Sequence, residues 1–213
     1  MKKAIAILAV LSFAAFAGEF AVCNSGPIET DADWLTYDDG TPHWYLTGGM
    51  YRGVWFNVED FNTSMGQAEI LKAEVWFCHG STRPWDISDV YFEIWDGVPT
   101  GPSPTGRRDQ TTITAVHNTA MYVDYASAPI TTVANDFWTV INLEMSGAGY
   151  PSSYMDKGPN VGQTPHSFGS EDMIIWEPFI HPDDPLNFMM RVYADLIPMS
   201  FDNTSWGSIK AIF

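Results

Sequence analysis

The chain has 213 residues and carries 26 acidic against 10 basic side chains, which gives a formal net charge of −16 at neutral pH. A surface of this sign repels phosphate groups, so nucleic acid and anionic membranes are excluded as natural partners. No apolar stretch beyond the N-terminus is long enough to predict a transmembrane helix.

The first 17 residues have the pattern of a secretory signal peptide. Lys2 and Lys3 precede an uncharged run from residue 4 to residue 16, and Ala15-Phe16-Ala17 supplies the small residues that a signal peptidase needs. The run is short for a membrane span, although a retained N-terminal anchor is an alternative. We expect cleavage after Ala17 and a bacterial protein that is secreted or held at the cell surface.

The mature chain is predicted to form one domain. All-β sandwiches of this length commonly fold as single units, and we find no internal repeat and no long linker. We expect a domain over residues 18–200 and a C-terminal tail over residues 201–213 that serves assembly, packing or sorting. The tail contains Trp206 and ends at Phe213.

Apolar and polar residues alternate in short segments, as half-buried strands require. The segments are 53–58, 69–77, 89–95, 120–125, 137–143, 173–176 and 188–194. Glycine, proline and aspartate separate them, and we expect the Pro-rich residues 99–104 to form a loop outside any ladder. The pattern predicts an all-β fold: a two-sheet antiparallel sandwich of jelly-roll type with eight or nine strands.

Several of these strands are apolar on both faces. Trp55, Trp76 and Trp95 lie on the face opposite to the apolar residues beside them. One face of a solvated antiparallel sheet is normally polar. We therefore expect the outer faces to be covered by a long loop, by the tail or by another copy of the protein.

Two stretches resemble β-sandwich surface domains of secreted bacterial proteins. The first is the Asp-Asp-Gly turn within residues 34–42, followed by Gly53-Val54-Trp55-Phe56, and the second is Glu93-Ile94-Trp95-Asp96-Gly97. The tail, with Ser205-Trp206-Gly207-Ser208-Ile209-Lys210, is similar to short C-terminal segments of exported proteins. The resemblance implies a jelly-roll module for surface display, adhesion or carbohydrate contact, and it implies no catalytic residues.

Aromatic side chains are the main candidates for binding. Many of the 9 Trp, 9 Tyr and 13 Phe can be absorbed by the core, but several stand next to turn residues. Exposed aromatic rings can stack on sugars or anchor a protein partner. The candidates for ligand or partner binding are Trp34, Trp44, Tyr45, Tyr51, Trp55, Trp85, Trp95, Trp206 and Phe213.

Calcium is the metal that the sequence favours, since the five histidines are widely spaced and form no transition-metal motif. Acidic pairs beside turns supply the oxygen ligands that calcium prefers, and the candidates are Asp38, Asp39, Asp183 and Asp184. Hydrated surface acids are the alternative, and otherwise no cofactor is expected. The two cysteines, Cys23 and Cys78, could form a disulfide in an oxidising compartment or remain two thiols.

The sequence contains no recognisable catalytic motif. Glycoside hydrolysis needs two carboxylates across a cleft, for which Glu93, Glu144 and Glu177 would be the candidates. Our first hypothesis is therefore an exported, non-enzymatic surface protein that associates with copies of itself in a filament, surface layer or adhesin. The alternative is a carbohydrate-binding module, with or without calcium, whose partners are surface glycans. A secreted glycoside hydrolase ranks third.

Overall fold

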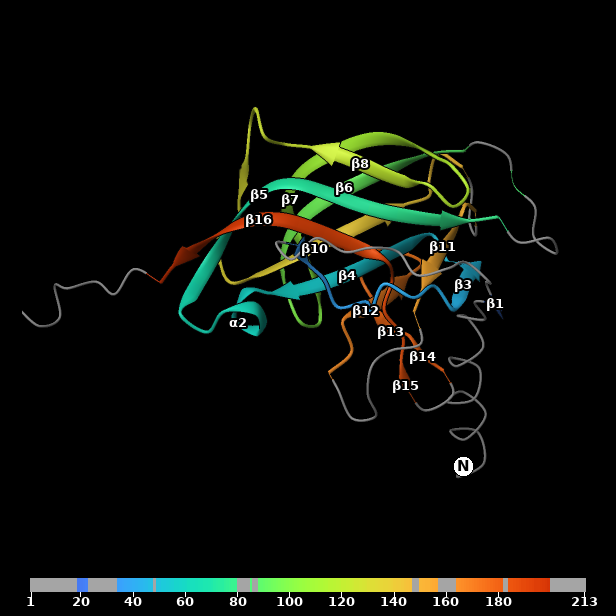
Figure 1. Ribbon diagram of the computed structural model, residues 1–213, viewed down its shortest axis with the longest axis horizontal. Coiled ribbons are helices and arrows are strands. Elements are labelled where there is room, and N and C mark those ends of the chain that lie inside the picture. Colours follow the sequence, from blue (N-terminus) through green and yellow to red (C-terminus); the bar gives the residue numbers. More distant parts are fainter. Residues whose placement is uncertain are drawn as a thin grey trace, which may run out of the picture.

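The computed structural model describes residues 19–22, 34–47, 49–79, 85, 88–146, 150–156, 164–181 and 184–199. Within these residues the chain forms 16 strands and the short helix α2 (Val58–Phe61). The prediction of an all-β, two-sheet antiparallel sandwich is confirmed, but short additional strands raise the number above the eight or nine expected (Figure 1). No helix in the described part is long and apolar enough to cross a membrane.

One sheet has eight strands and is organised around the long strand β5 (Met65–Cys78). β5 pairs along most of its length with β16 (Met190–Pro198), and the two lie side by side in Figure 1. The other members are β1 (Glu19–Val22), β3 (Trp44–Thr47), β11 (Ser152–Met155), β2 (Trp34–Leu35), β8 (Ala120–Asp124) and β9 (Ile130–Thr131).

The second sheet has six strands in the order β13, β12, β4, β10, β6, β7. Their bounds are β13 (Glu177–Pro178), β12 (Ser167–Ser170), β4 (Tyr51–Asn57), β10 (Asp136–Asn142), β6 (Ser88–Val98) and β7 (Gly101–Ala115). A separate two-stranded ribbon joins β14 (Ile180–His181) and β15 (Asp184–Pro185). Helix α2 follows β4 directly, and the Asn57 side chain caps it by accepting the Glu59 N–H.

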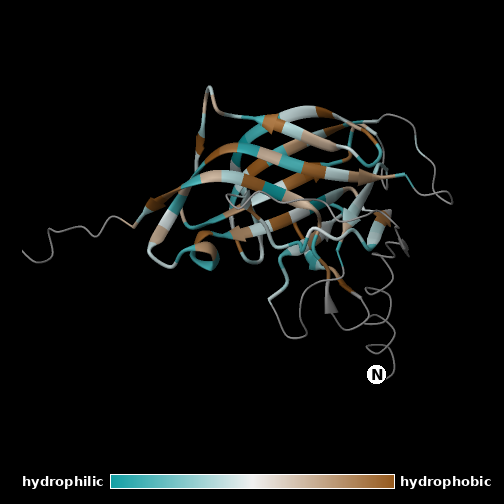
Figure 2. Ribbon diagram, in the orientation of Figure 1, coloured by the Kyte–Doolittle hydropathy of each residue, from teal (hydrophilic) through white to brown (hydrophobic). Residues whose placement is uncertain are grey.

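The core between the sheets follows the predicted alternation, which Figure 2 shows as hydrophobic and hydrophilic bands along the strands. Phe56, Phe77 and Phe92 face inward and have no exposed surface. The alternation of residues 69–77 predicts that Leu71 points inward together with Phe77. Leu71 is only partly buried, because β5 carries an irregularity there: Tyr193 pairs with Lys72, whereas Ala194 pairs with Ile70. Such a bulge shifts the alternation by one residue, so Ile70 fills the core instead.

The predicted strand over residues 173–176 is wrong. The Asp172 carboxylate accepts the backbone N–H groups of Ile174 (2.8 Å) and Ile175 (3.0 Å), and Met173 has a positive φ of 64°. These features close a tight turn in place of a strand, because aspartate offers the backbone a local acceptor. The turn leaves the side chain of Ile174 80% exposed and that of Ile175 65% exposed.

The Pro-rich segment also differs from its prediction as a loop. Only residues 99 and 100 form the turn, and β7 begins at Gly101, with Pro102 paired to Gly97. β7 lies at the edge of the six-stranded sheet, where a residue without an N–H is tolerated.

The outer face of the six-stranded sheet carries a second apolar cluster. Trp55 and Trp95 are 6% and 9% exposed, and they pack there with Tyr51, Trp138, Val140, Phe168 and Trp176. These aromatic side chains are on the expected face, but segments of the chain itself cover them. Trp55 and Trp95 are therefore buried by the chain itself. Their position on the outer face no longer supports the self-association hypothesis.

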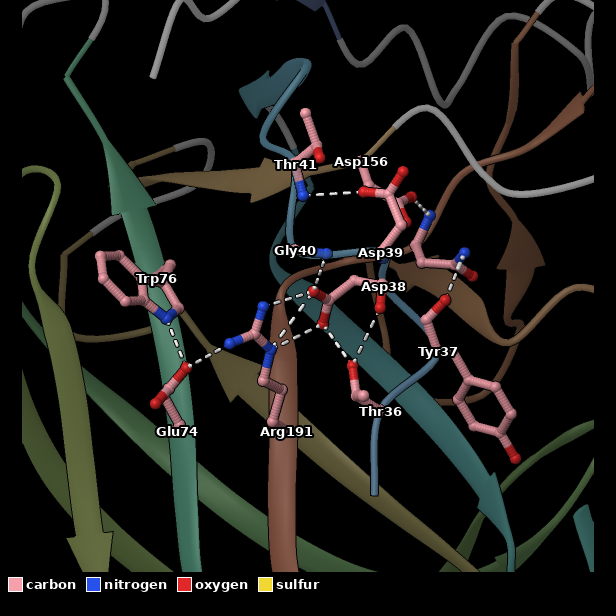
Figure 3. Close-up of polar contacts among 11 residues, drawn as sticks. Thr36, Tyr37, Asp38, Asp39, Gly40, Thr41, Glu74, Trp76, Asp156 and Arg191 are labelled. Carbon is pink, nitrogen blue, oxygen red and sulfur yellow. Dashed lines mark hydrogen bonds and ion pairs between the residues drawn. The ribbon is translucent and has the colours of Figure 1, made fainter. Parts of the chain in front are cut away.

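On the outer face of the eight-stranded sheet, the Asp38-Asp39-Gly40 turn lies against Arg191 (Figure 3). Arg191 projects outward from β16 and is 1% exposed. It donates from Nη2 to Asp38 Oδ1 (2.6 Å), from Nε to Asp38 Oδ2 (3.0 Å) and from Nη1 to Glu74 Oε1 (3.1 Å). Burial lowers the pKa of Arg191, but its bonds to the two carboxylates outweigh burial and raise this pKa above its ordinary value.

Asp38 was a candidate calcium ligand, but the structure gives its carboxylate another partner. Both oxygens bond to Arg191, and they also accept the Thr36 hydroxyl (2.7 Å) and the Gly40 N–H (3.0 Å). A guanidinium of the chain itself thus stands where a metal ion was expected. Asp39 is exposed, and its side chain accepts the Thr41 N–H (2.7 Å).

We predict that Asp38→Asn lowers the free energy of unfolding by about 3 kcal/mol, because it leaves a buried guanidinium short of one counter-ion. Urea denaturation measures this loss. Asp39→Asn is the matched control on an exposed neighbour and should change stability by no more than about 0.5 kcal/mol. Equal effects of the two substitutions would contradict this role of Asp38.

Candidate functional site

A groove of about 950 Å³ lies on the outer face of the six-stranded sheet. Its floor includes Tyr51, Glu93 and Trp95 from β4 and β6. The β6–β7 hairpin forms one wall. The remaining lining residues are Val133, Ala134, Asp136, Asn142, Glu144, Met173 and Ile174. A concave site with a few convergent polar groups is the usual form of a small-ligand site.

Two glycines allow the hairpin to lie across the sheet. A Cβ on Gly97 would stand 2.5 Å from Cδ1 of Trp138, and one on Gly101 would stand 2.9 Å from Cδ1 of Trp176. Only residues without a side chain permit this close approach of the backbone to the indole rings. The pairing of β6 with β7 is also irregular at Trp95, as strongly bent hairpins require.

Glu93 is the buried charge of the groove floor, with none of its surface exposed. Its carboxylate accepts hydrogen bonds from Trp95 Nε1 (2.7 Å), Gln110 Nε2 (2.8 Å) and Asn142 Nδ2 (3.2 Å). These three donors come from β6, β7 and β10. They hold the carboxylate in one orientation, which is the pre-organisation that a binding site needs.

Glu144 stands beside Glu93 in the groove. Asn142 Nδ2, which bonds to Glu93, also donates to Glu144 Oε2 (3.4 Å). The Tyr51 hydroxyl donates to the other oxygen, Glu144 Oε1. Burial, followed by the bond to Glu144 and its charge, raises the pKa of Tyr51 far above its usual value.

Two arginines of β7 reach the groove. Arg107 Nη1 lies 3.5 Å from Glu93 Oε1, and its guanidinium lies 5.6 Å from the centre of the Trp95 ring. Its side chain is 47% exposed, whereas that of Glu93 is 1% exposed. Arg108 forms an ion pair with Asp96 instead. The floor thus combines carboxylates, amides, guanidinium groups and aromatic rings.

The rim of the groove is apolar. Val98, Val133 and Ile174 line it and are 55%, 59% and 80% exposed. Val98 ends β6, Val133 lies between β9 and β10, and Ile174 lies in the turn that Asp172 caps. Large aliphatic side chains gathered at the mouth of a polar groove commonly mark a contact surface.

The structure places the predicted aromatic residues at several sites. Tyr51 and Trp95 belong to the groove. Trp34 is half-buried, and its ring lies 5.9 Å from that of Tyr193, whereas Trp44 contacts His43 edge-on. Tyr45 is buried in a small cluster, and Trp85 donates to the Cys78 carbonyl (2.6 Å).

Some predicted residues fall outside the described part of the chain. They are Trp206, Phe213, Asp183, Cys23 and the side chain of Asp184. Cys78 is buried, and its pairing with Cys23 stays a prediction. Among the residues that the structure describes, no group of three or more histidine, cysteine, aspartate or glutamate side chains could hold a metal ion.

Of the three carboxylates considered for hydrolysis, the groove contains two. Glu93 and Glu144 are neighbours there, whereas Glu177 is exposed on β13, at the opposite edge of the sheet from β7. Asn142, Gln110 and Arg107 were not among the residues predicted from the sequence. A usable signal existed for Asn142, since it stands two residues before Glu144 at the end of an apolar strand.

Trp55 lies near the C-terminal end of β4, where its ring is part of a stack of three packed rings. The His166 ring lies between Tyr37 (3.5 Å between ring centres) and Trp55 (4.9 Å). His166 Nδ1 lies 3.0 Å from the Trp55 carbonyl oxygen, and Nε2 lies 3.7 Å from Asp60. Burial lowers the pKa of His166, and this outweighs the Trp55 carbonyl and the charge of Asp60, which raise it.

The lowered pKa predicts a dependence of stability on pH. The unfolded chain takes up a proton on His166 near its ordinary pKa of 6.5, whereas the folded chain takes it up only at lower pH. Stability is therefore full above this pH and falls as pH drops through it. Urea denaturation at about pH 7.5 and about pH 5.5 should show a smaller loss for His166→Phe than for the unsubstituted protein.

The exposed His79 offers the control for this prediction. His79→Phe should leave the pH-dependent loss as it is in the unsubstituted protein. An identical loss in His166→Phe would show that His166 does not carry the effect.

Neither a protein-family model, nor a curated protein, nor a solved structure matches this chain. The groove and its chemistry therefore provide the basis for a functional assignment.

Proposed function

We propose that this chain is an exported, non-enzymatic carbohydrate-binding module that holds a saccharide in the groove above the six-stranded sheet. The observation that supports this most directly is the juxtaposition of Glu93, Asn142 and Glu144 on the groove floor, next to the Trp95 ring. Each sugar hydroxyl is both a donor and an acceptor. A floor that alternates carboxylates with amide and guanidinium groups can satisfy both roles.

The surroundings of this floor also fit a saccharide. Tyr51 and Trp95 line the groove although the chain covers most of each ring, and the aliphatic rim can cover the apolar faces of sugar rings. The size of the groove is within the range that small-ligand sites occupy, about 300–1,000 Å³. Bonds to one another hold the polar groups in place, so little ordering is needed upon binding.

We predict that a glycan array probed with residues 18–213 identifies at least one oligosaccharide ligand. Glu144→Gln should lower the affinity for that ligand about tenfold, because a charged acceptor of hydroxyl groups becomes neutral. Isothermal titration calorimetry measures this change. Glu177→Gln is the same substitution on an exposed glutamate outside the groove, and it should leave the affinity unchanged.

Failure of every glycan to bind would overturn the proposal. Release of reducing ends from the bound oligosaccharide would show a glycoside hydrolase instead, with Glu93 and Glu144 as its carboxylates. Addition of a chelator in the same titration tests whether calcium takes part.

Self-association is a second candidate function, and the Ile174–Ile175 turn favours it. Ile175 is 65% exposed, and bonds from Asp172 hold the turn rigidly. A stiff, projecting apolar tip loses little conformational entropy upon contact and can anchor an interface between copies. If two different surfaces meet in this contact, the copies extend into a filament.

We predict that Ile175→Asp weakens any self-association at least tenfold, since a charge at the centre of an apolar contact is costly. Sedimentation velocity over a range of concentrations measures the dissociation constant. Thr112→Asp, at an exposed position of β7, introduces the same charge and should have no effect. A chain that remains monomeric at high concentration would remove this second candidate.

A further inference from the structure

The groove contains a cation of the chain itself in an unusual position. Arg107 Nη1 lies 3.5 Å from the carboxylate of Glu93, and the guanidinium lies 5.6 Å from the centre of the Trp95 ring. A carboxylate and an aromatic ring that face one cation form the recognised environment for ammonium and guanidinium groups. This corner of the groove therefore has the chemistry of a cation site.

Arg107 is not locked into this site. Its side chain is 47% exposed, while Glu93 is fully buried and held by three neutral donors. Arg191, the buried arginine of the other sheet, instead makes short bonds to two carboxylates and is 1% exposed. The half-exposed guanidinium can leave toward solvent and the buried carboxylate cannot, so a second cation can take its place on Glu93.

The charges around the groove also favour a cationic ligand. Glu93, Glu144, Asp96 and Asp136 line it together with Arg107 and Arg108, so acidic groups outnumber basic ones. Glu144 accepts from Tyr51 and Asn142, and Asp136 accepts from Trp55, all of which are neutral donors. These two charges attract a cation that enters the groove.

We infer that the Glu93–Trp95 corner is a subsite for the protonated amine of an amino sugar, in which Arg107 stands in for the cation of the ligand. The inference rests on the proposed carbohydrate-binding function and specifies its substrate class. The ligand amine displaces Arg107, bonds to Glu93 and faces the Trp95 ring. The remaining sugar hydroxyls then contact Asn142 and Glu144.

The test compares two oligosaccharides of equal length, a glucosamine oligomer and its N-acetylated counterpart. They share a sugar skeleton, but only the first carries protonated amines. Calorimetric titration at low ionic strength should give tighter binding of the glucosamine oligomer, and added salt should weaken that binding. Cello-oligosaccharide and oligogalacturonate supply neutral and anionic comparisons.

Arg107→Ala removes the stand-in cation and should raise the affinity for the glucosamine oligomer about tenfold, with no gain for the N-acetylated oligomer. Arg107→Gln retains a donor for Glu93 without the charge. It should show the same selective gain, and it covers the case in which the alanine variant folds poorly. Arg108→Ala removes an equal charge from the same wall, so it measures the effect of net charge alone and should raise the affinity for the glucosamine oligomer much less than Arg107→Ala does.

Three results would overturn the subsite and leave the proposed function intact. The first is weaker binding of both oligomers by the Arg107 variants, which would make Arg107 a direct donor to the ligand. The second is an equal gain from Arg107→Ala and Arg108→Ala, which would reduce the effect to net charge. Preference for a neutral or anionic saccharide likewise contradicts the subsite alone, whereas failure of every saccharide to bind overturns both proposals.

Discussion

Large side chains on both faces of the strands are the constraint on which this structure depends. Two packed sheets hide only the faces that meet, so the outer faces need cover of their own. The chain provides it twice. The Asp38 turn closes over Arg191 on one sheet, and the β6–β7 hairpin lies on the indole rings of Trp138 and Trp176 on the other.

The second cover also produces the groove. The hairpin can rest on the indole rings only where Gly97 and Gly101 remove their side chains, and its bent path leaves a hollow beside Trp95. Outward residues that would face solvent in a simple sandwich, such as Glu93, then become buried at the bottom of a concave site. The site is thus a consequence of how the outer face is covered, not of the core.

The sequence was sufficient for most of the long strands, with β7 as the exception, but not for the segments that cover the outer faces of the sheets. Alternation placed Trp55 and Trp95 on the outer face correctly, because side-chain direction is local to a strand. Their burial depends on segments distant in sequence, such as His166 against Trp55, and no local pattern reports those contacts. Leu71 and Met173 were misassigned for a related reason, since a bulge and an aspartate-capped turn each break the period of two.

Two buried acids, Asp38 and Glu93, show why we treat the groove as functional and the ion pairs around Arg191 as structural. Asp38 faces a guanidinium as buried as itself, in a closed set of bonds that leaves no path for an exchange of partners. Glu93 faces a guanidinium that is half in solvent, at the floor of an open groove. Stability alone does not require a carboxylate there, since apolar residues commonly replace buried ion pairs at no cost. A buried acid with a displaceable cation is the arrangement that a binding site for amines needs.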